Sequence, residues 1–409
     1  MRKPMAERFD RPLLVITLLL SLMGVVMLYS AAHNEAVQGV PRSLLQVGWL
    51  AIGWVVLYCV AVVPTRVLHA LSIPFYFIII ALLIAVLATD AVKGSSRWLR
   101  LGPFGLQPSE LAKVAVILVL ARYLDGQRRS TNRLLLLLPP CLFVGLPIAL
   151  IIKQPDLGTS LVFGALLIGM LYWNGISVLE LLLILSPIAN VLINVLSGFN
   201  WLIWTGFMLS LFLILYLSRT PLLASLIVLL GHVGVGITTE PLWNSLHDYQ
   251  RQRVETFVNP YEDALGAGYQ IIQSKIAIGS GGLFGKGLLK GTQTQLSFLP
   301  EQHTDFIFSV VGEELGFVGA IVVLGLFFLL VTRGIRIASE VKGRYHSLIA
   351  AGCVSVFAFH VIVNVGMTTG LFPVVGVPLP FLSYGGSSLL TNMTLVGLLL
   401  NVWRRRHEY

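Results

Sequence analysis

Three titratable residues stand together directly before a long apolar stretch. Glu301, His303 and Asp305 lie within five residues, and residues 306–331 after them are almost entirely apolar. Ionisable groups are costly to hold near lipid, so chemistry is the leading explanation for such a cluster at the mouth of a membrane span. A carboxylate held there could accept a proton from a hydroxyl as a general base, and Asp305 is the foremost candidate.

A second interpretation of Asp305 is structural. It stands where the apolar helix should begin, so its carboxylate could cap the first turn, which is worth about 1 kcal/mol. Thr304 could cap the helix equally well and would leave the carboxylate of Asp305 available for chemistry. The sequence leaves both interpretations open.

Two further acidic residues, Glu313 and Glu314, lie two turns deeper in the same stretch. Exposing both to lipid would be costly, so we expect at least one of them to pack or pair inside the protein.

Gln107, Glu110 and Lys113 follow one another at intervals of three residues, which places a carboxylate and an ammonium on one helix face. One interpretation is a structural ion pair within a helical bundle. The other is a cationic site near the outer membrane surface for an acidic lipid headgroup, in which Arg97 from the preceding loop takes part. Spacing alone does not decide between them.

A glycine-rich run at residues 279–291 superficially resembles a phosphate-binding loop. It fails the P-loop pattern, because Lys286 is followed by Gly287 where Ser or Thr is required. Either the run folds back along the membrane surface, with glycine where backbones pass closely, or its amides contact a polyanion together with Lys286 or Lys290.

Near the C-terminus, prolines and glycines interrupt an otherwise apolar stretch at residues 364–388. Irregular backbone at membrane depth is tolerated only where it is buried in protein or lines a water-filled cavity. We therefore expect this segment to line a cavity.

The composition indicates an integral membrane protein. Of the 409 residues, 56% are hydrophobic and 11% are charged, far from the composition of a soluble domain. The net charge of +9 is distributed over short loops in the alternating pattern that orients membrane proteins, which argues against a nucleic-acid partner. The three cysteines lie in apolar runs and predict neither a disulfide framework nor a metal site.

The apolar runs predict an all-α fold, a polytopic transmembrane helical bundle that forms a single domain over residues 1–409. A large extracytoplasmic loop, residues 241–305, precedes the tenth span. About twelve spans are predicted, at residues 13–31, 45–63, 73–87, 111–124, 134–152, 160–173, 179–195, 202–217, 222–237, 306–331, 348–367 and 388–402.

Basic residues predict the orientation of the bundle. They fall in loops at residues 122–133, 219, 333–344 and 404–406, and the positive-inside rule then places both termini in the cytoplasm. The polar segments facing outward are residues 90–107, 153–157, 241–304 and 371–384.

Several of these motifs resemble a known family. Asn364, then Gly370-x-x-Pro373, then Pro-Phe-Leu-Ser-Tyr-Gly-Gly-Ser-Ser at residues 380–388 is similar to the signature of the SEDS proteins (shape, elongation, division and sporulation). Four further segments resemble conserved blocks of the same family and occur in the same order as in the family: residues 107–113, 154–159, 248–253 and 298–308.

The amino-acid sequences of residues 291–301 and 376–380 resemble those of the elongation branch of this family rather than those of its division branch. One departure is that the family usually has ten spans, whereas this chain is predicted to carry an extra helical hairpin within residues 176–239.

The resemblance implies a SEDS fold and a peptidoglycan glycosyltransferase that polymerises lipid II in the bacterial cytoplasmic (inner) membrane. It implies a class B penicillin-binding protein and other elongation-complex proteins as partners. It also implies that Asp305 is the essential outward-facing aspartate of the large loop.

Polymerisation by inverting displacement of undecaprenyl pyrophosphate needs a base and cationic help for the leaving group. The hypothesis assigns Asp305 as the base, Lys113 with Arg97 as pyrophosphate contacts, and Glu110 as the residue that positions Lys113. Further candidate substrate-binding residues in the outward-facing segments are Trp98, Gln107, Asp156, Gln273, Lys275, His303, Thr304 and Ser383.

No ligand cluster in the sequence demands a metal, and a divalent cation, Mg²⁺ or Mn²⁺, is left open as a partner of the pyrophosphate. Two rival functions are also left open. Broken helices and about twelve spans suit a transporter or a lipid-precursor flippase. A non-catalytic scaffold of the elongation machinery would combine the same outer loops with interaction surfaces.

Overall fold

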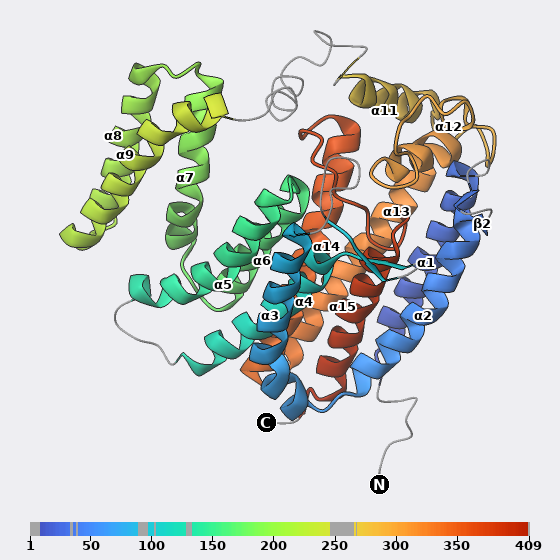
Figure 1. The fold of residues 1–409 in the computed structure, drawn as a ribbon, viewed down its shortest axis with the longest axis horizontal. Helices are drawn as coiled ribbons and strands as arrows, with labels where there is room; N and C mark the ends of the chain where they lie inside the picture. Colours follow the sequence, from blue (N-terminus) through green and yellow to red (C-terminus); the bar gives the residue numbers. More distant parts are fainter. Residues whose placement is uncertain are drawn as a thin grey trace.

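The computed structural model describes residues 9–32, 36–37, 40–88, 97–101, 104–127, 133–245, 266 and 268–407 (Figure 1). The helices before the large loop are α1 (Arg11–Ala31), α2 (Arg42–Val62), α3 (Thr65–Leu87), α4 (Pro108–Gly126), α5 (Arg133–Lys153), α6 (Leu157–Trp173), α7 (Val178–Leu196), α8 (Trp201–Leu217) and α9 (Leu222–Ser245). Those after it are α11 (Tyr269–Ser280), α12 (Thr292–Gln295), α13 (Ile307–Glu340), α14 (Arg344–Thr369) and α15 (Gly386–Arg404). Two short antiparallel hairpins pair β1 (Ala36–Val37) with β2 (Val40–Pro41) and β3 (Leu99–Leu101) with β4 (Phe104–Leu106).

The predicted all-α fold is confirmed. Each of the twelve predicted apolar runs lies in a helix, to within one residue at either end. Seven of the described helices, α1, α2, α3, α7, α9, α13 and α14, are long and apolar enough to cross a membrane, and shorter apolar helices are found at α6, α8 and Leu138–Lys153 of α5. The remaining two predicted spans, α4 and α15, hold buried polar residues, because they face protein rather than lipid.

The core of the bundle is formed by α4, α14 and α15, which are buried along most of their lengths. α14 packs against α4, α6, α13 and α15, while α15 packs along α2. Gly352 shows how close this packing is: a Cβ there would lie 3.0 Å from side-chain atoms of Ile117 in α4 and Met170 in α6. In Figure 1 these helices occupy the middle of the molecule, with α1 and α2 along one side and α3 along the other.

Helices α7, α8 and α9 form a separate group beside this bundle (Figure 1). They pack mainly against one another, and α7 also contacts α6. A buried polar network joins the three helices: Asn190 donates to the His232 carbonyl at 2.8 Å, and the indole of Trp204 donates to Asn190 at 3.0 Å. Buried polar contacts of this kind hold apolar helices together in lipid. The region of the predicted extra hairpin, residues 176–239, therefore holds a three-helix group.

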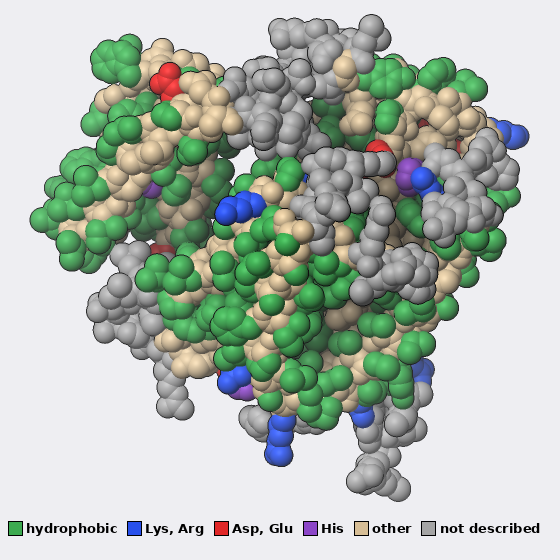
Figure 2. Space-filling model, in the orientation of Figure 1, with side chains coloured by type: hydrophobic (Ala, Val, Ile, Leu, Met, Phe, Trp, Pro, Cys, Tyr) green, Lys and Arg blue, Asp and Glu red, His purple; other side chains and the backbone are tan. Residues whose placement is uncertain are grey.

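The surface of the molecule suits a lipid environment. Hydrophobic side chains cover the visible flank of the bundle and of the α7–α9 group, and several Lys and Arg side chains lie at the lower end of the bundle (Figure 2). Leu222 and Leu230 of α9 are 77% and 68% exposed. Apolar patches this extensive need a lipid or protein cover.

The glycine-rich run supplies hydrogen-bond partners for the backbone at a break in α13. Gly316 has a φ of 67° inside this helix, so the helical hydrogen bonds fail there. The amides of Lys286 and Gly287 donate to the carbonyls of Glu313 and Glu314, each at 3.0 Å. Carbonyls of the same run accept from the amides that follow Gly316. Of the two interpretations of residues 279–291, the structure confirms close backbone packing, because interrupted backbone at membrane depth needs such partners.

The predicted large loop, residues 241–305, is more structured than a loop. Its first five residues still belong to α9, and it contains α11 and α12. The family block at residues 248–253 lies outside the described residues.

Candidate active site

The carboxylate of Asp305 does not cap the apolar helix. The N-cap of α13 is Phe306, and no side chain caps it. Asp305 lies in the tight turn before it, half-buried, with its amide donating to the Glu301 carbonyl at 3.2 Å. The Thr304 hydroxyl bonds Glu301 within the same turn. Of the two interpretations of Asp305, helix capping is therefore wrong.

The turn that holds Asp305 is fastened by α14 and by the irregular segment after it. The side-chain amide of Asn364, which is fully buried, donates to the Asp305 carbonyl at 2.8 Å and to the Val377 carbonyl at 2.7 Å. Ser383 donates to the Thr304 carbonyl at 2.5 Å. The Tyr384 amide donates to the His303 carbonyl at 2.9 Å. Residues 303–305 and 377–384 thus form one hydrogen-bonded unit.

Gly376 brings the irregular segment against the Asp305 side chain. Its φ is 73°, a left-handed conformation that glycine adopts without strain. A Cβ on Gly376 would lie 3.2 Å from Oδ2 of Asp305. A Cβ on Gly158, near the start of α6, would lie 2.3 Å from the Val375 carbonyl oxygen and 3.2 Å from that of Gly376. The expectation that this segment lines a site is supported, since its backbone forms one wall beside Asp305.

Glu110 and Lys113 form a buried ion pair. The two side chains are 2.8 Å apart, and the residues are 3% and 1% exposed. The Lys113 ammonium also lies 3.3 Å from Nε2 of His360, whose Nδ1 lies 2.9 Å from the Pro378 carbonyl. The pairing that the spacing predicted is confirmed. The alternative of a headgroup site at the outer surface is not, because Lys113 is enclosed by the bundle.

Arg97 is also used internally. Its guanidinium donates to the Gln154 carbonyl at 3.0 Å and to the carbonyl of Pro155. Asp156 caps α6 by accepting from Thr159, and the Gln107 side chain donates to Asp156 at 3.4 Å. These predicted site residues form a polar network between the starts of α4 and α6.

Helix N-termini converge around this network. The Gln107 amide, at the start of α4, donates to the Ser387 hydroxyl in the first turn of α15 at 3.2 Å. α6 begins at the Asp156 cap, and α13 begins two residues after Asp305. The positive ends of several helix dipoles therefore face one region, which favours bound anions.

A cavity of about 620 Å³ opens beside the Asp305 turn. Its polar end is formed by Arg42, His303 and Thr304, and Arg42 and His303 are hydrogen-bonded to each other. The Arg42 guanidinium lies 5.8 Å from the centre of the Tyr384 ring. Its apolar flank follows α2, and its remaining lining residues are Val40, Leu44, Leu45, Gly48, Trp49, Ile52, Trp98, Gly105, Tyr384, Gly385 and Gly386.

Asp305 is not itself among the residues that line this cavity, and it directly follows the lining residue Thr304. The predicted substrate-binding residues divide into three groups. Trp98, His303 and Thr304 line the cavity. A second group supports the surrounding framework and comprises Arg97, Gln107, Glu110, Lys113, Asp156 and Ser383.

The third group, Gln273 and Lys275, lies on α11. The adjacent Ser274 donates to the Thr368 carbonyl at 2.6 Å and bonds Ser309, which docks α11 against α13 and α14. The exposed Lys275 side chain lies against Gly370, the left-handed residue that ends α14. Neither Gln273 nor Lys275 lines the cavity described above.

Arg42, Tyr384 and His360 are site residues that the sequence reasoning missed. Arg42 had a detectable signal, because it is a cation at the predicted outer end of a span, contrary to the usual distribution of basic residues. Tyr384 lies within the recognised signature and was not singled out. His360 had no spacing signal, because its partners Lys113 and Pro378 come from other parts of the chain.

Glu313 holds the end of the large loop in place. Its carboxylate, fully buried, accepts from the amides of Gln293 at 2.9 Å and Thr294 at 3.0 Å, and lies 3.0 Å from the Lys286 ammonium. Glu314 accepts from the Ser30 hydroxyl at 2.6 Å. The expectation that at least one of these carboxylates is paired inside the protein is confirmed.

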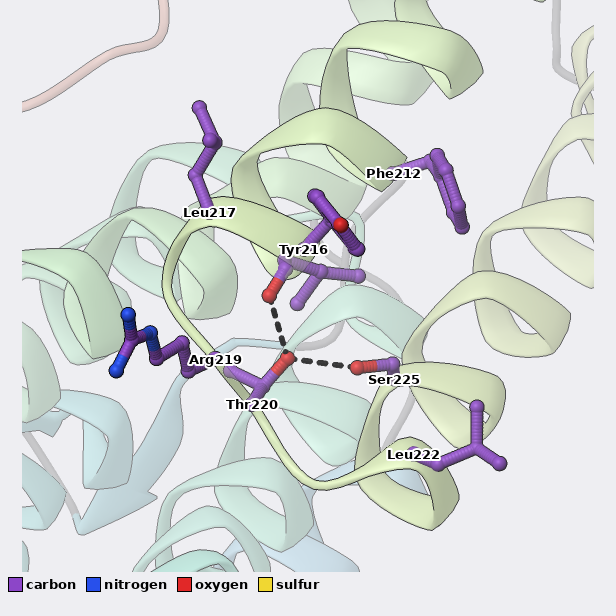
Figure 3. A pocket seen from close by; sticks show the side chains of 8 residues that line it. Phe212, Tyr216, Leu217, Arg219, Thr220, Leu222 and Ser225 are labelled. Carbon is purple, nitrogen blue, oxygen red and sulfur yellow. Dashed lines mark hydrogen bonds between the residues drawn. The ribbon is translucent and has the colours of Figure 1, made fainter.

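A second cavity, of about 580 Å³, lies at the turn between α8 and α9 (Figure 3). The Thr220 hydroxyl donates to the Leu215 carbonyl and bonds Ser225 at its edge. None of the predicted site residues lines it, so it is separate from the candidate site.

No group of three or more His, Cys, Asp or Glu within the described ranges is arranged to hold a metal ion. A protein-only metal centre is therefore not part of the described site.

Comparisons with known proteins agree on one group of relatives. The FtsW/RodA/SpoVE family model, described as cell cycle protein, matches residues 11–205 and 203–408. The peptidoglycan glycosyltransferase MrdB of Escherichia coli K12 is 38% identical over 97% of this chain and 94% of its own length. The peptidoglycan glycosyltransferase RodA of Treponema pallidum is also 38% identical, over 97% of this chain and 98% of its own.

Solved structures show the same fold. A chain from a structure described as structural coordination of polymerization and crosslinking by a peptidoglycan synthase complex superposes with a TM-score of 0.72 at 31% identity, covering 98% of this chain and 99% of the other. The crystal structure of the rod shape determining protein RodA of Thermus thermophilus superposes with a TM-score of 0.63 at 26% identity, covering 98% of both chains. The chain is thus similar to multi-pass membrane proteins along its whole length.

Proposed function

Because the chain belongs to the FtsW/RodA/SpoVE family of cell cycle proteins, we propose that it is a peptidoglycan glycosyltransferase of cell elongation. It polymerises lipid II into β-1,4 glycan strands. The names of its relatives, peptidoglycan glycosyltransferase MrdB and RodA, support this activity.

The observation that carries the proposal is the cavity beside Asp305. One end is polar, with Arg42, His303 and Thr304, and the other runs along apolar residues of α2 such as Leu45 and Ile52. A sugar pyrophosphate attached to a polyprenyl chain has the same division into a polar head and an apolar tail. Such sites are typically apolar clefts with a few placed polar groups.

Asp305 serves as the general base in this proposal. Its carboxylate takes the proton from the C4 hydroxyl of the acceptor sugar, whose oxygen forms a bond to the anomeric carbon of the donor. The bond from that carbon to the pyrophosphate oxygen breaks, and undecaprenyl pyrophosphate leaves. One displacement inverts the α-linked donor to a β-linked product. A positioned base of this kind contributes about 10²–10⁴-fold to the rate.

Arg42 is the cation that we propose for the leaving pyrophosphate, in place of Lys113 and Arg97. It lies at the polar end of the cavity, whereas Lys113 is 1% exposed and Arg97 donates to two backbone carbonyls. A planar guanidinium suits pyrophosphate because it donates two parallel hydrogen bonds. The converging helix N-termini add a favourable potential for the same charge.

Glu110 and Lys113 then act as positioning residues. The pair holds His360, which contacts the Pro378 carbonyl in the irregular segment that presses Gly376 against Asp305. Through His360 the buried pair holds this segment in position, and neither Glu110 nor Lys113 contacts the substrate in this proposal.

The proposed location is the bacterial cytoplasmic membrane, with both termini in the cytoplasm. Arg11 and Arg404 lie at the end of the bundle where α1 begins and α15 ends, and such basic ends stay cytoplasmic. The candidate active site then faces outward, where glycan strands are assembled.

The proposed partner is a class B penicillin-binding protein that crosslinks the new strand, together with other elongation-complex proteins. The similarity to a chain from a peptidoglycan synthase complex supports this partnership. A divalent cation, Mg²⁺ or Mn²⁺, is proposed to reach the site with the pyrophosphate of the substrate, because pyrophosphate oxygens are hard ligands that suit either ion.

The test is lipid II polymerisation by the purified protein with its transpeptidase partner. We expect Asp305→Asn to lose about 10²–10⁴-fold in rate while lipid II binding is retained. Glu340→Gln is the matched control, because it makes the same carboxylate-to-amide change at the C-terminal end of α13, where Glu340 pairs with Arg336. Full-length glycan from Asp305→Asn would refute the base assignment.

The rival functions predict different results for the wild-type protein. A flippase would move labelled lipid II headgroups across proteoliposomes and make no polymer. A scaffold would do neither, while still increasing polymer yield by other enzymes.

A further inference from the structure

A cavity of about 460 Å³ lies at the end of the bundle away from the candidate active site. α1 starts there, whereas its other end, at Ala31, accepts a hydrogen bond from Gln302 of the large loop. The cavity is lined by Phe9, Asp10, Arg11, Pro12, Arg333, Trp403 and Arg406. The glycosyltransferase proposal uses none of these side chains.

The carboxylate of Asp10 already has hydrogen-bond and ion-pair partners within the protein. Asp10 is 2% exposed and caps α1 by accepting from the Leu13 amide at 2.8 Å. Both of its oxygens accept from the Nε of Arg333, at 3.1 and 3.0 Å, and a terminal nitrogen of Arg333 bonds one of them. This ion pair joins the start of α1 to the last third of α13 and neutralises one of the arginines.

The other two arginines of the cavity keep their charge without a carboxylate partner among the described residues. Arg406 donates to the Trp403 carbonyl at 3.0 Å, and its guanidinium lies 4.1 Å from the centre of the Trp403 ring. Arg333 lies 5.0 Å from the same ring. Arg11 is exposed at the cavity edge. Three guanidiniums against one carboxylate leave the cavity positively charged.

The position of the cavity decides which anion can reach it. Trp403 lies at the end of α15, with Arg333 and Arg406 against its ring. α1 begins at Arg11 in the same cavity. Tryptophan and arginine are the residues that settle at the boundary between hydrocarbon and headgroups. Basic cavities between transmembrane helices at this depth bind lipid phosphates.

We propose that this cavity binds the phosphate headgroup of an anionic phospholipid. Arg11 and Arg406 contact the phosphate, for which guanidinium geometry is well suited. Trp403 supports the Arg406 side chain through a cation–π contact. The proposal is independent of the glycosyltransferase activity, since the site lies at the other end of the bundle.

The experiment measures lipid binding by native mass spectrometry of the full-length detergent-purified protein. Phosphatidylglycerol, phosphatidylethanolamine and glycerol 3-phosphate are titrated separately. Arg406→Gln and Arg11→Gln each remove one cation from the cavity. Arg336→Gln is the matched control, because Arg336 also lies near the end of α13 but is 66% exposed and pairs with Glu340 at 2.6 Å.

We expect the wild-type protein to bind phosphatidylglycerol more tightly than phosphatidylethanolamine. Arg406→Gln and Arg11→Gln should each weaken phosphatidylglycerol binding about five-fold, the share of one basic residue near a membrane surface. Arg336→Gln should leave it unchanged. Arg333 is not replaced, because its partner Asp10 also caps α1 and the variant could fail to fold.

Three results would overturn the proposal. Equal losses in Arg406→Gln and Arg336→Gln would show a general charge effect rather than a site. Glycerol 3-phosphate binding as tightly as the lipid would show a site for a free phosphate. Unchanged lipid binding in Arg406→Gln, with loss of the co-purified transpeptidase partner, would show a protein contact.

Discussion

The side-chain amide of Asn364 in α14 holds the backbone of Asp305 in the turn before α13, donating to its carbonyl at 2.8 Å. The same amide donates to the Val377 carbonyl at 2.7 Å. One buried side chain therefore joins the turn that carries the proposed base to the segment that forms its wall. The contact holds the proposed base through its main chain.

Replacing Asn364 should misplace the base. Asn364→Ala leaves the buried Val377 carbonyl and the half-buried Asp305 carbonyl without this donor, at a cost of about 1–3 kcal/mol for the buried group. We expect the thermal unfolding midpoint to fall. We also expect the rate of lipid II polymerisation to fall further than the loss of folded protein explains. Ser355→Ala is the control on the same helix, because the Ser355 hydroxyl donates to Ala351 within α14. Normal turnover in Asn364→Ala would contradict a positioning role.

Separating stability from activity at Glu110 and Lys113 needs a double replacement. Lys113→Met alone leaves a buried carboxylate without its ion-pair partner, and breaking a buried pair costs about 3–5 kcal/mol. Glu110→Leu with Lys113→Met should regain most of that stability, measured by thermal unfolding. We expect its turnover to stay about tenfold low at unchanged KM, a positional effect, because His360 has lost its Lys113 contact. Full recovery of activity would reduce the pair to a structural role.

Gly376 should not tolerate a side chain. Gly376→Ala forces a left-handed φ of 73° on an L-residue, at a cost of about 1–2 kcal/mol, and places a Cβ 3.2 Å from Oδ2 of Asp305. We expect polymerisation to fall about tenfold to a hundredfold. Gly175→Ala is the control, because Gly175 also has a left-handed φ, of 91°, but a Cβ there would meet no atom within 4 Å. Equal losses in both variants would exclude a specific effect on Asp305.

The pH profile should not depend on Tyr384. Burial raises the pKa of Tyr384 above its ordinary value, and Arg42 opposes this only in part. Since the folded pKa lies above about 10, the phenol stays neutral at every lower pH. We expect kcat/KM of wild type and Tyr384→Phe to follow the same pH curve below about pH 10. An alkaline decline in that range that disappears in Tyr384→Phe would contradict this expectation.

Much of the fold could be predicted from the sequence, because membrane insertion depends on local hydropathy. A run of apolar residues long enough to cross the bilayer must form a helix, since its backbone has no other hydrogen-bond partners there. The twelve predicted runs therefore coincide with helices. The exception is the large loop, where α11 and α12 form in a segment whose composition is typical of a loop.

The candidate site was predictable only in part. Asp305 could be found because its cluster of titratable groups contrasts with the apolar stretch that follows, and because the family block at residues 298–308 includes it. Lys113 shows the limit. Its spacing from Glu110 indicated the ion pair but not the direction of the helix face, and the structure places that face inside the bundle.

The sequence by itself determined the class of protein, the helices, and Asp305 as the first candidate for chemistry. Only the tertiary structure decided which cation faces the cavity. Arg42 and His303 are 261 residues apart and meet at its polar end, while Asn364 and Asp305 meet through a main-chain carbonyl that every residue type possesses. Hydropathy acts locally along the chain, whereas contacts between distant segments arise from helix packing, so their residue types carry no signal until the helices are assembled.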